Sequence, residues 1–313
     1  MGRISLVAKR PCASAQADYF ATQLRMRTLI LTLICLSMNG AWATLRVEQI
    51  EVPVTVRNMF GEAIAQPVHV TIYSDDSNPV PAPVLVINHG RGVSAEDRSH
   101  QGLERLDVAA RFFVRRGFIV AVPIRIGYGA SGGDDLEDDG GMCERLFFSP
   151  GFEVAAKQVL TVLNAVRRRP DAAPDRAVLL GQSYGGAVMI TVAAKNPPGV
   201  QLLINFAGGS GGDPDNRPGN PCSADELGRL FVKYGRTARV PMVWVYAKND
   251  LFWGAAYPRA WFSSFLDAGG VAEFVQLPPH GTDGHSLFTR FHDVWQPCIV
   301  QYLDKHGFVP RQR

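Results

Sequence analysis

What the sequence lacks narrows the class of protein that it encodes. Its cysteines and histidines are nowhere grouped with the spacing of a zinc site. It has no internal repeat and no low-complexity stretch, which excludes a repeat array. Charged residues make up only 19% of the chain and hydrophobic residues 46%, and these ordinary proportions exclude a disordered chain.

The N-terminal region has an apolar run, residues 29–36, that is too short to cross a bilayer, since a spanning helix needs about 20 residues. Basic residues at positions 25 and 27 precede the run, and Ala41-Trp42-Ala43 follows it. These are the three parts of a secretory signal. We therefore predict a signal peptide from Met26 to Ala43, with cleavage near Ala43, the alternative being a buried N-terminal helix.

The signal peptide sets the predicted domain organisation and location. Residues 1–43 form an N-terminal extension with the signal peptide, Met26 being the better start, and residues 44–313 form a single domain. The first 43 residues hold five basic residues and one acid, while the whole chain carries +3, so the remainder is near −1. The basicity therefore serves targeting and predicts no nucleic-acid partner. We expect a periplasmic or secreted protein without stable membrane association after cleavage.

Three of the five cysteines lie beyond the predicted signal. Export permits disulfides, and Cys143 and Cys222 both lie in segments rich in glycine, proline and polar residues. We predict a disulfide between these two cysteines and a buried thiol at Cys298, which lies in an apolar helical stretch. The alternative is that all three are reduced.

From Leu45 onward, strand-like and helix-like segments alternate, which is typical of a sheet with helices on both faces. The first two strands alternate apolar and polar residues like an edge hairpin, and the others are short apolar runs like strands buried on both faces. The expected strands are 46–56, 68–73, 84–88, 118–122, 177–180, 202–206, 242–246 and 273–277. The expected helices are 103–115, 152–168, 184–195, 224–233, 256–268 and 286–305.

Two expected loops, residues 127–151 and 208–223, are longer than most connections. Each follows the C-terminal end of an expected parallel strand, where open sheets of this kind place their ligands. We therefore expect both loops to border a functional site, the alternative being two solvated insertions.

A glycine-flanked serine lies between an expected strand and an expected helix, in Gly181-Gln182-Ser183-Tyr184-Gly185. A nucleophile on a sharp strand-to-helix turn needs small residues two before and two after it, because side chains there would collide. A free serine hydroxyl is a weak nucleophile, so a base must take its proton. We predict Ser183 as a nucleophile that is activated in this way.

The base and the acid that orients it should follow the serine in the order acid, then base. Asp250 comes just after the expected strand 242–246, and His285 follows the last expected strand and opens the last helix. We predict His285 as the base and Asp250 as the carboxylate that fixes its tautomer. The alternatives are His280 as the base and Asp283 as the acid, both on the loop of His285.

Negative charge that develops on a substrate carbonyl oxygen requires fixed N–H donors. One predicted donor is the backbone N–H of Tyr184, the residue after the nucleophile. The other is the backbone N–H of Arg91, in the segment His89-Gly90-Arg91-Gly92 that follows the strand 84–88.

The segment from His89 to Gly92, the motif around Ser183 and the pairs Asn249-Asp250 and Gly284-His285 together resemble the dienelactone-hydrolase-like branch of the α/β-hydrolases. The resemblance covers nearly all of the chain after residue 43. It implies the α/β-hydrolase fold, a mostly parallel eight-stranded sheet with helices on both faces, together with a covalent acyl-enzyme and no cofactor. The lack of zinc-like spacing among the cysteines and histidines predicts no metal. Dienelactone hydrolases proper use a cysteine where this chain has a serine, so the resemblance implies a general carboxylester hydrolase.

The expected substrate is a small-molecule ester. The alternatives are a peptidase of the prolyl-oligopeptidase type and a catalytically silent relative that binds a ligand. Residues predicted to line the substrate pocket are Tyr128, Phe252 and Trp253, of which the last two could instead pack their own loop. Residues predicted either to hold an anionic group or to be solvated are Arg91, Arg98 and Arg125.

Overall fold

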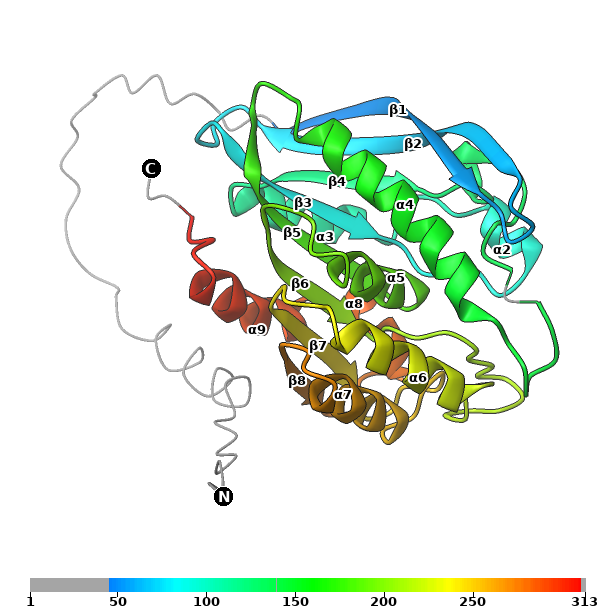
Figure 1. Ribbon diagram of the computed structural model, residues 1–313. Coiled ribbons are helices and arrows are strands. Elements are labelled where there is room, and N and C mark those ends of the chain that lie inside the picture. Colours follow the sequence, from blue (N-terminus) through cyan, green and yellow to red (C-terminus); the bar gives the residue numbers. More distant parts are fainter. Residues whose placement is uncertain (1–44, 139, 311–313) are drawn as a thin grey trace, which may run out of the picture.

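The computed structural model describes residues 45–138 and 140–310 (Figure 1). The predicted signal peptide lies outside the described residues. These residues form one sheet of eight strands in the order β1-β2-β4-β3-β5-β6-β7-β8. The strands are β1 (Leu45–Arg57), β2 (Ala63–Asp75), β3 (Ala82–Asn88), β4 (Ile119–Ile124), β5 (Ala172–Gln182), β6 (Val200–Phe206), β7 (Met242–Ala247) and β8 (Ala272–Leu277).

Most of the sheet is parallel, as the sequence predicts. Strands β1 and β2 form an antiparallel hairpin, and β2 also runs antiparallel to β4. The remaining neighbours, from β4 and β3 through to β8, all pair in parallel. The carboxyl ends of the parallel strands therefore meet at one edge of the sheet, and the loops that follow them can share a site.

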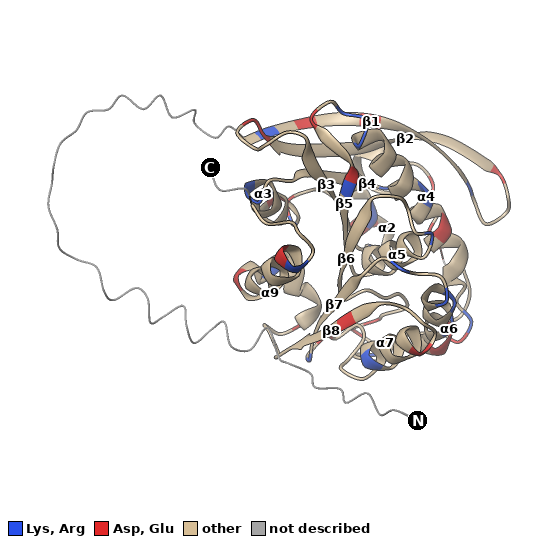
Figure 2. Ribbon diagram, turned by 60° about the vertical axis from the view of Figure 1, so that its left-hand side comes forward, with Lys and Arg blue, Asp and Glu red and all other residues tan. Residues whose placement is uncertain are grey.

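Helices cover both faces of the sheet (Figures 1 and 2). Helices α4 to α7 lie on one face, and α3, α8 and α9 lie on the other. The helices are α2 (Ala95–Ser99), α3 (Asp107–Arg115), α4 (Phe148–Val166), α5 (Tyr184–Ala193), α6 (Ala224–Gly235), α7 (Tyr257–Asp267), α8 (Leu287–Arg290) and α9 (His292–Lys305), with 3₁₀ turns η1 (Gly129–Ser131) and η2 (Gly284–Ser286). Among the described residues, no helix combines the length and the apolarity that crossing a membrane requires.

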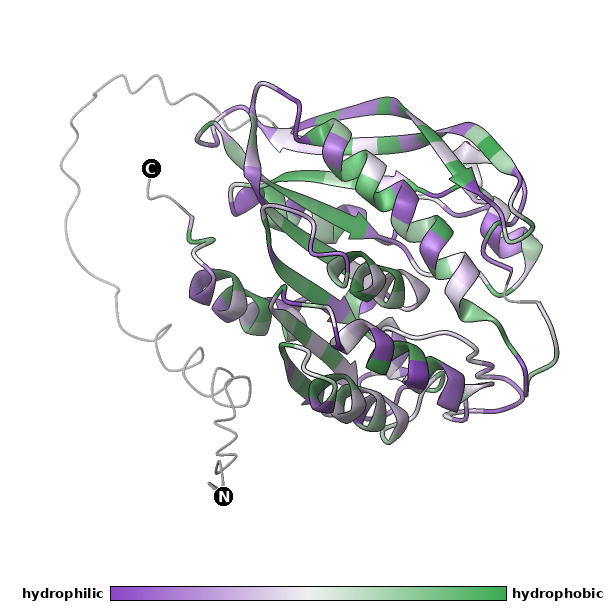
Figure 3. Cartoon of the chain, in the orientation of Figure 1, coloured by the Kyte–Doolittle hydropathy of each residue, from purple (hydrophilic) through white to green (hydrophobic). Residues whose placement is uncertain are grey.

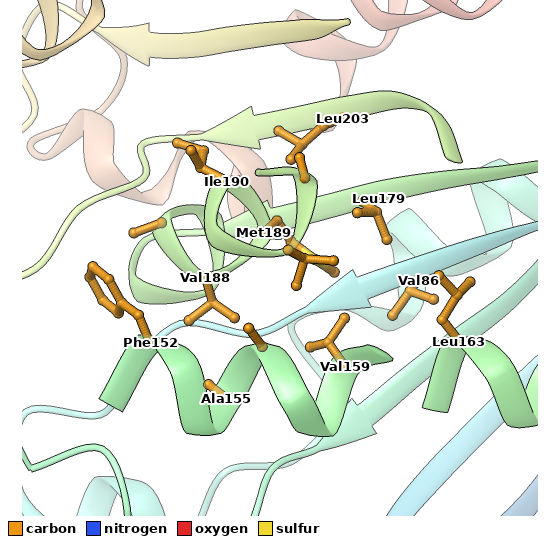
Figure 4. Packing of buried hydrophobic residues seen from close by; sticks show 14 of the residues in the cluster. Val86, Phe152, Ala155, Val159, Leu163, Leu179, Val188, Met189, Ile190 and Leu203 are labelled. Atoms are coloured by element: carbon orange, nitrogen blue, oxygen red, sulfur yellow. The ribbon is translucent and has the colours of Figure 1, made fainter. Parts of the chain in front are cut away.

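Helices α4 and α5 pack against each other and against the central strands in the core. In α4, Phe152, Ala155 and Val159 recur at helical spacing and face α5 and the strands (Figure 4). Helix α5 is buried along its whole length, and its Val188 packs in the same cluster as Leu179 of β5 (Figure 4). The central strands are correspondingly apolar, while α4 and α6 carry polar residues on their outer sides (Figure 3). This burial anchors the junction of β5 and α5, which carries Ser183.

The structure corrects three expected helices, of which α3 begins at Asp107 instead of residue 103. Helix α4 begins at Phe148 instead of residue 152, because Pro150 lies in the first helical turn, where a missing N–H breaks no helical hydrogen bond. The expected helix 286–305 is split at Phe291, whose φ of −117° and ψ of 56° are not helical. The Phe291 ring lies against the loop before α8, where a Cβ on Gly281 would come within 2.7 Å of it.

Candidate active site

Ser183 stands on a strained turn between β5 and α5. Its φ of 57° and ψ of −129° are unusual for a residue other than glycine. A Cβ on Gly181 would lie 2.2 Å from the carbonyl oxygen of Gly185, and a Cβ on Gly185 would lie 2.3 Å from that of His89. Both glycines are therefore required by close backbone approach, which is the reason that the motif has this spacing.

The three residues predicted to act together converge at the carboxyl edge of the sheet. The Oγ of Ser183 lies 2.9 Å from Nε2 of His285. On the other side of the ring, Nδ1 of His285 lies 3.0 Å and 3.2 Å from the two carboxylate oxygens of Asp250. All three residues are largely buried. Such a chain can pass a proton from the hydroxyl to the imidazole while the carboxylate balances the charge of the ring.

The alternatives weighed from the sequence make different contacts. Oδ1 of Asp283 accepts the backbone N–H groups of His285 and Leu251, each at 2.9 Å, and so fixes the loop that carries the histidine. The ring of His280 lies 2.7 Å from the carbonyl oxygen of Pro278. Asp283 therefore holds the backbone of His285, whereas Asp250 faces its ring.

Aromatic side chains hold the imidazole in place. The ring of Phe252 stacks on that of His285 with centroids 3.9 Å apart, and Trp253 approaches it edge-on at 5.4 Å. The indole N–H of Trp253 donates to the carbonyl oxygen of Ala207 at 2.7 Å. Oδ1 of Asp250 accepts the backbone N–H groups of both aromatic residues. The segment after β7 thus orients the imidazole of His285 and the carboxylate of Asp250 together.

The three residues predicted to line the substrate pocket differ in how much of their surface is exposed. Trp253 and Tyr128 have only 1% and 0% of their surface exposed, so both lie beneath the rim. Phe252 is partly buried and is the one of the three that retains exposed surface beside His285.

The proposed oxyanion donors lie on two segments near the serine. Tyr184 is the first residue of α5, where a backbone N–H has no helical acceptor. The loop after β3 passes close to the serine, since a Cβ on Gly90 would lie 3.2 Å from Cβ of Ser183. Gly90 thereby lets the Gly90–Arg91 peptide approach Ser183.

The three arginines near the rim all contact carboxylates of the protein itself. Arg91 forms a paired contact with Asp135, two hydrogen bonds of 2.7 Å, and Arg98 lies 3.1 Å from the same carboxylate. Arg125 is fully buried and forms an ion pair with Glu137, which is fully buried too. Arg125 is therefore not solvated, and each guanidinium already has a carboxylate partner inside the protein.

A disulfide joins the two long loops. Cys143, after β4, is bonded to Cys222, after β6. Beside the bond, Oγ of Ser223 donates to the carbonyl oxygen of Cys143 at 2.8 Å. Cys298 is buried as expected, but the expected thiol is wrong, because this cysteine is also disulfide-bonded.

Within the described residues, no group of histidine, cysteine, aspartate and glutamate side chains is arranged to hold a metal ion. The strained serine turn, the Ser183–His285–Asp250 chain and the sheet order define the α/β-hydrolase fold.

Comparison with known proteins supports this class at the level of the fold. No protein-family model matches the chain, and no curated protein matches its sequence. Solved structures do match. An acetyl xylan esterase from Paenibacillus sp. R4 is 13% identical with a TM-score of 0.57, over 84% of this chain and 89% of that one. A protein described as a dienelactone hydrolase from Klebsiella pneumoniae is 14% identical with a TM-score of 0.52, over 82% and 98%.

A larger protein shares the same fold. An acylaminoacyl peptidase from Pyrococcus horikoshii is 12% identical with a TM-score of 0.54, over 84% of this chain but only 42% of its own. Identities this low show a common fold, so the activity has to be argued from the site itself.

Proposed function

We propose that the protein is a serine hydrolase that cleaves small or medium carboxylic esters through a covalent acyl-enzyme. One observation carries the proposal, the unbroken hydrogen-bonded chain from Ser183 through His285 to Asp250, with spacings of 2.9 Å and 3.0 Å. Esterases among the proteins of similar fold support the same reaction class.

In the first half of the reaction, His285 takes the proton from Ser183 as Oγ attacks the acyl carbon. The carbonyl oxygen becomes negatively charged, and the backbone N–H groups of Tyr184 and Arg91 stabilise it. When the tetrahedral intermediate collapses, the bond to the alcohol oxygen breaks and the imidazolium gives its proton to the leaving alcohol. The products are a free alcohol and an acyl group on Ser183.

In the second half, water replaces the alcohol. His285 takes a proton from water as its oxygen attacks the acyl-enzyme, and the same N–H donors hold the second tetrahedral intermediate. Collapse returns the proton to Oγ of Ser183 and releases the carboxylic acid. No residue is consumed, and the residues named suffice for both halves.

A substrate series tests the proposal. We expect the protein to hydrolyse p-nitrophenyl acetate and butyrate, with an initial burst of p-nitrophenol wherever deacylation is the slower step. Matched acyl p-nitroanilides test the amide bond in the same assay, and a fluorophosphonate tests for a reactive serine. Folded protein that neither turns over an ester nor reacts with the fluorophosphonate would falsify the proposal and favour a silent ligand-binding relative.

Cleavage of the anilides as fast as the esters would favour a peptidase instead. The acylaminoacyl peptidase shares this fold, but more than half of its chain lies outside the match.

We also infer that the protein is exported to an oxidising compartment as a single domain over residues 44–313. The signal-like pattern from Met26 to Ala43 and the disulfide between Cys143 and Cys222 support this inference. Expression of the full chain in a Gram-negative host, followed by fractionation and N-terminal sequencing, tests it. The expected product is periplasmic or secreted and begins near Thr44, whereas an uncleaved cytosolic product would contradict it.

A further inference from the structure

The buried guanidinium of Arg125 forms hydrogen bonds with the loop that carries the second proposed oxyanion donor, the N–H of Arg91. Nη1 of Arg125 donates to the side-chain oxygen of Asn88 and to the carbonyl oxygen of His89, both at 2.7 Å. Nη2 donates to the carbonyl oxygen of Gly90 at 3.1 Å. The last residue of β3 and the two residues after it are therefore fixed by one side chain, which directly follows β4.

Glu137 holds this guanidinium from the opposite side. Its carboxylate accepts from Nε and Nη2 of Arg125, the latter at 3.0 Å, and from the hydroxyl of Tyr128 at 2.6 Å. The arginine and the glutamate are both fully buried. Because desolvation offsets much of the attraction in such a pair, a buried ion pair is a poor device for stability alone. The contacts of this ion pair instead hold the loop that passes beside Ser183.

His89 adds a second donor to the same carbonyl group. Its Nε2 accepts the backbone N–H of Arg125 at 3.1 Å, so the ring proton must be on Nδ1, which lies 2.7 Å from the carbonyl oxygen of Gly90. Burial, and next the charge of Arg125, hold the pKa of His89 well below its usual value. A neutral ring with this tautomer donates to Gly90 at every pH near neutrality.

These contacts fix the direction of the next N–H. The Gly90–Arg91 peptide is trans, and in a trans peptide the C=O and N–H bonds point in opposite directions across one plane. The carbonyl of Gly90 points inward to Arg125 and His89. The N–H of Arg91 must therefore point outward, on a loop whose Gly90 approaches Cβ of Ser183.

We propose that Arg125, Glu137 and His89 are positioning residues that lock the Gly90–Arg91 peptide plane with its N–H aimed at the substrate carbonyl oxygen. This inference rests on the proposed esterase function. Hydrogen bonds to the Gly90 carbonyl also polarise the peptide and strengthen its N–H as a donor.

The same guanidinium reaches the other donor. The carbon at its centre lies 5.6 Å from the ring centroid of Tyr184, within the range of a cation–π contact, and Tyr184 carries the first oxyanion N–H. Arg125 therefore contacts the ring of Tyr184 and the carbonyl group of the Gly90–Arg91 peptide, whose N–H is the second proposed donor.

A double variant that keeps the side-chain volume but removes the Arg125–Glu137 ion pair tests the proposal. In R125M/E137L the buried charges are replaced together, a change that buried pairs often tolerate without loss of stability. A misaimed donor should lower kcat for an ester by ~10²–10³, the usual effect of losing one oxyanion donor, and leave KM nearly unchanged. The matched control R169M/E48L removes an arginine–glutamate pair at the amino end of β5, and we expect it to keep wild-type kcat.

The discriminating measurement compares an ester with its thionoester. A sulfur atom in place of the carbonyl oxygen is a weak hydrogen-bond acceptor, so a well-aimed N–H favours the ester much more. We expect R125M/E137L to lower the ester-to-thionoester ratio of kcat/KM by at least tenfold, with the control unchanged. A purely structural defect would lower both rates together and preserve the ratio.

A second variant covers the case in which the pair replacement fails to fold. R125K keeps the positive charge, but one ammonium cannot reach the three acceptors that the guanidinium fork spans, and we expect the same fall in ratio. A folded variant with the wild-type ratio overturns this inference. If S183A keeps wild-type turnover, the proposed function fails instead; if S183A is inactive and the ratio is unchanged, only the positioning role fails.

Discussion

Replacing Ser183 with alanine is expected to lower kcat for p-nitrophenyl esters by ~10⁴ or more, as in other enzymes that lose a member of such a triad. The hydroxyl lies 2.9 Å from Nε2 of His285, and it is the group that forms the acyl-enzyme in the proposed reaction. Without it the remaining machinery can only assist direct attack by water. Steady-state kinetics and the loss of fluorophosphonate labelling, read by intact mass, measure the effect.

The control for this variant is an equally small change elsewhere. Ser263 lies on the exposed side of α7, so S263A should keep both turnover and labelling. Circular dichroism of S183A should match the wild type, because the elbow geometry depends on Gly181 and Gly185. Retention of ester turnover by folded S183A would rule out Ser183 as the nucleophile.

Replacing Asp250 with asparagine is expected to leave the fold intact and lower kcat by about 10⁴. The asparagine oxygen can still accept the backbone N–H groups of Phe252 and Trp253, so the segment after β7 keeps its shape. The side-chain amide can present a donor to Nδ1 of His285, which favours the wrong tautomer and leaves the imidazolium without its counter-charge. Thermal unfolding and kcat, measured on the same preparation, separate these effects.

Asp283 supplies the matched control for Asp250. Its carboxylate meets the backbone N–H groups of Leu251 and His285 instead of the ring. D283N should therefore cost much less in kcat than D250N. A larger loss in D283N than in D250N would show that the acid had been assigned to the wrong residue.

Local sequence pattern was enough to predict the parts of the site that depend on backbone geometry. The glycines around Ser183 could be interpreted because two peptide segments meet there at distances that exclude a Cβ. The positions of Asp250 and His285 followed from counting strands, since a residue just after a parallel strand must lie at the carboxyl edge. Chain order and topology sufficed for both inferences.

The interior of the site was not predictable in the same way. Glu137 lies in the acidic run from Asp134 to Asp138, where nothing in the pattern distinguishes the one buried carboxylate from its neighbours. For its partner Arg125 the sequence predicts an anion-binding or a solvated side chain, because arginines are seldom fully buried. Such a pairing depends on where a long loop folds back, and that is a three-dimensional property.

A short helix was missed although a local signal for it existed. Helix α2 begins after Ser94, whose side chain accepts the N–H of Asp97 while the carboxylate of Asp97 accepts the N–H of Ser94. This capping box is visible in the sequence as a serine followed three residues later by an acid. Hydrophobic periodicity does not predict this helix, because the segment has no apolar stripe and none of its residues is buried.

The bond between Cys143 and Cys222 has a consequence for anyone who would alter the substrate range of this protein. It turns two stretches that are 79 residues apart in the chain into one mechanical unit. An insertion or deletion in either stretch would be transmitted to the other. Libraries that diversify the rim should therefore vary both stretches jointly, under oxidising expression, instead of one at a time.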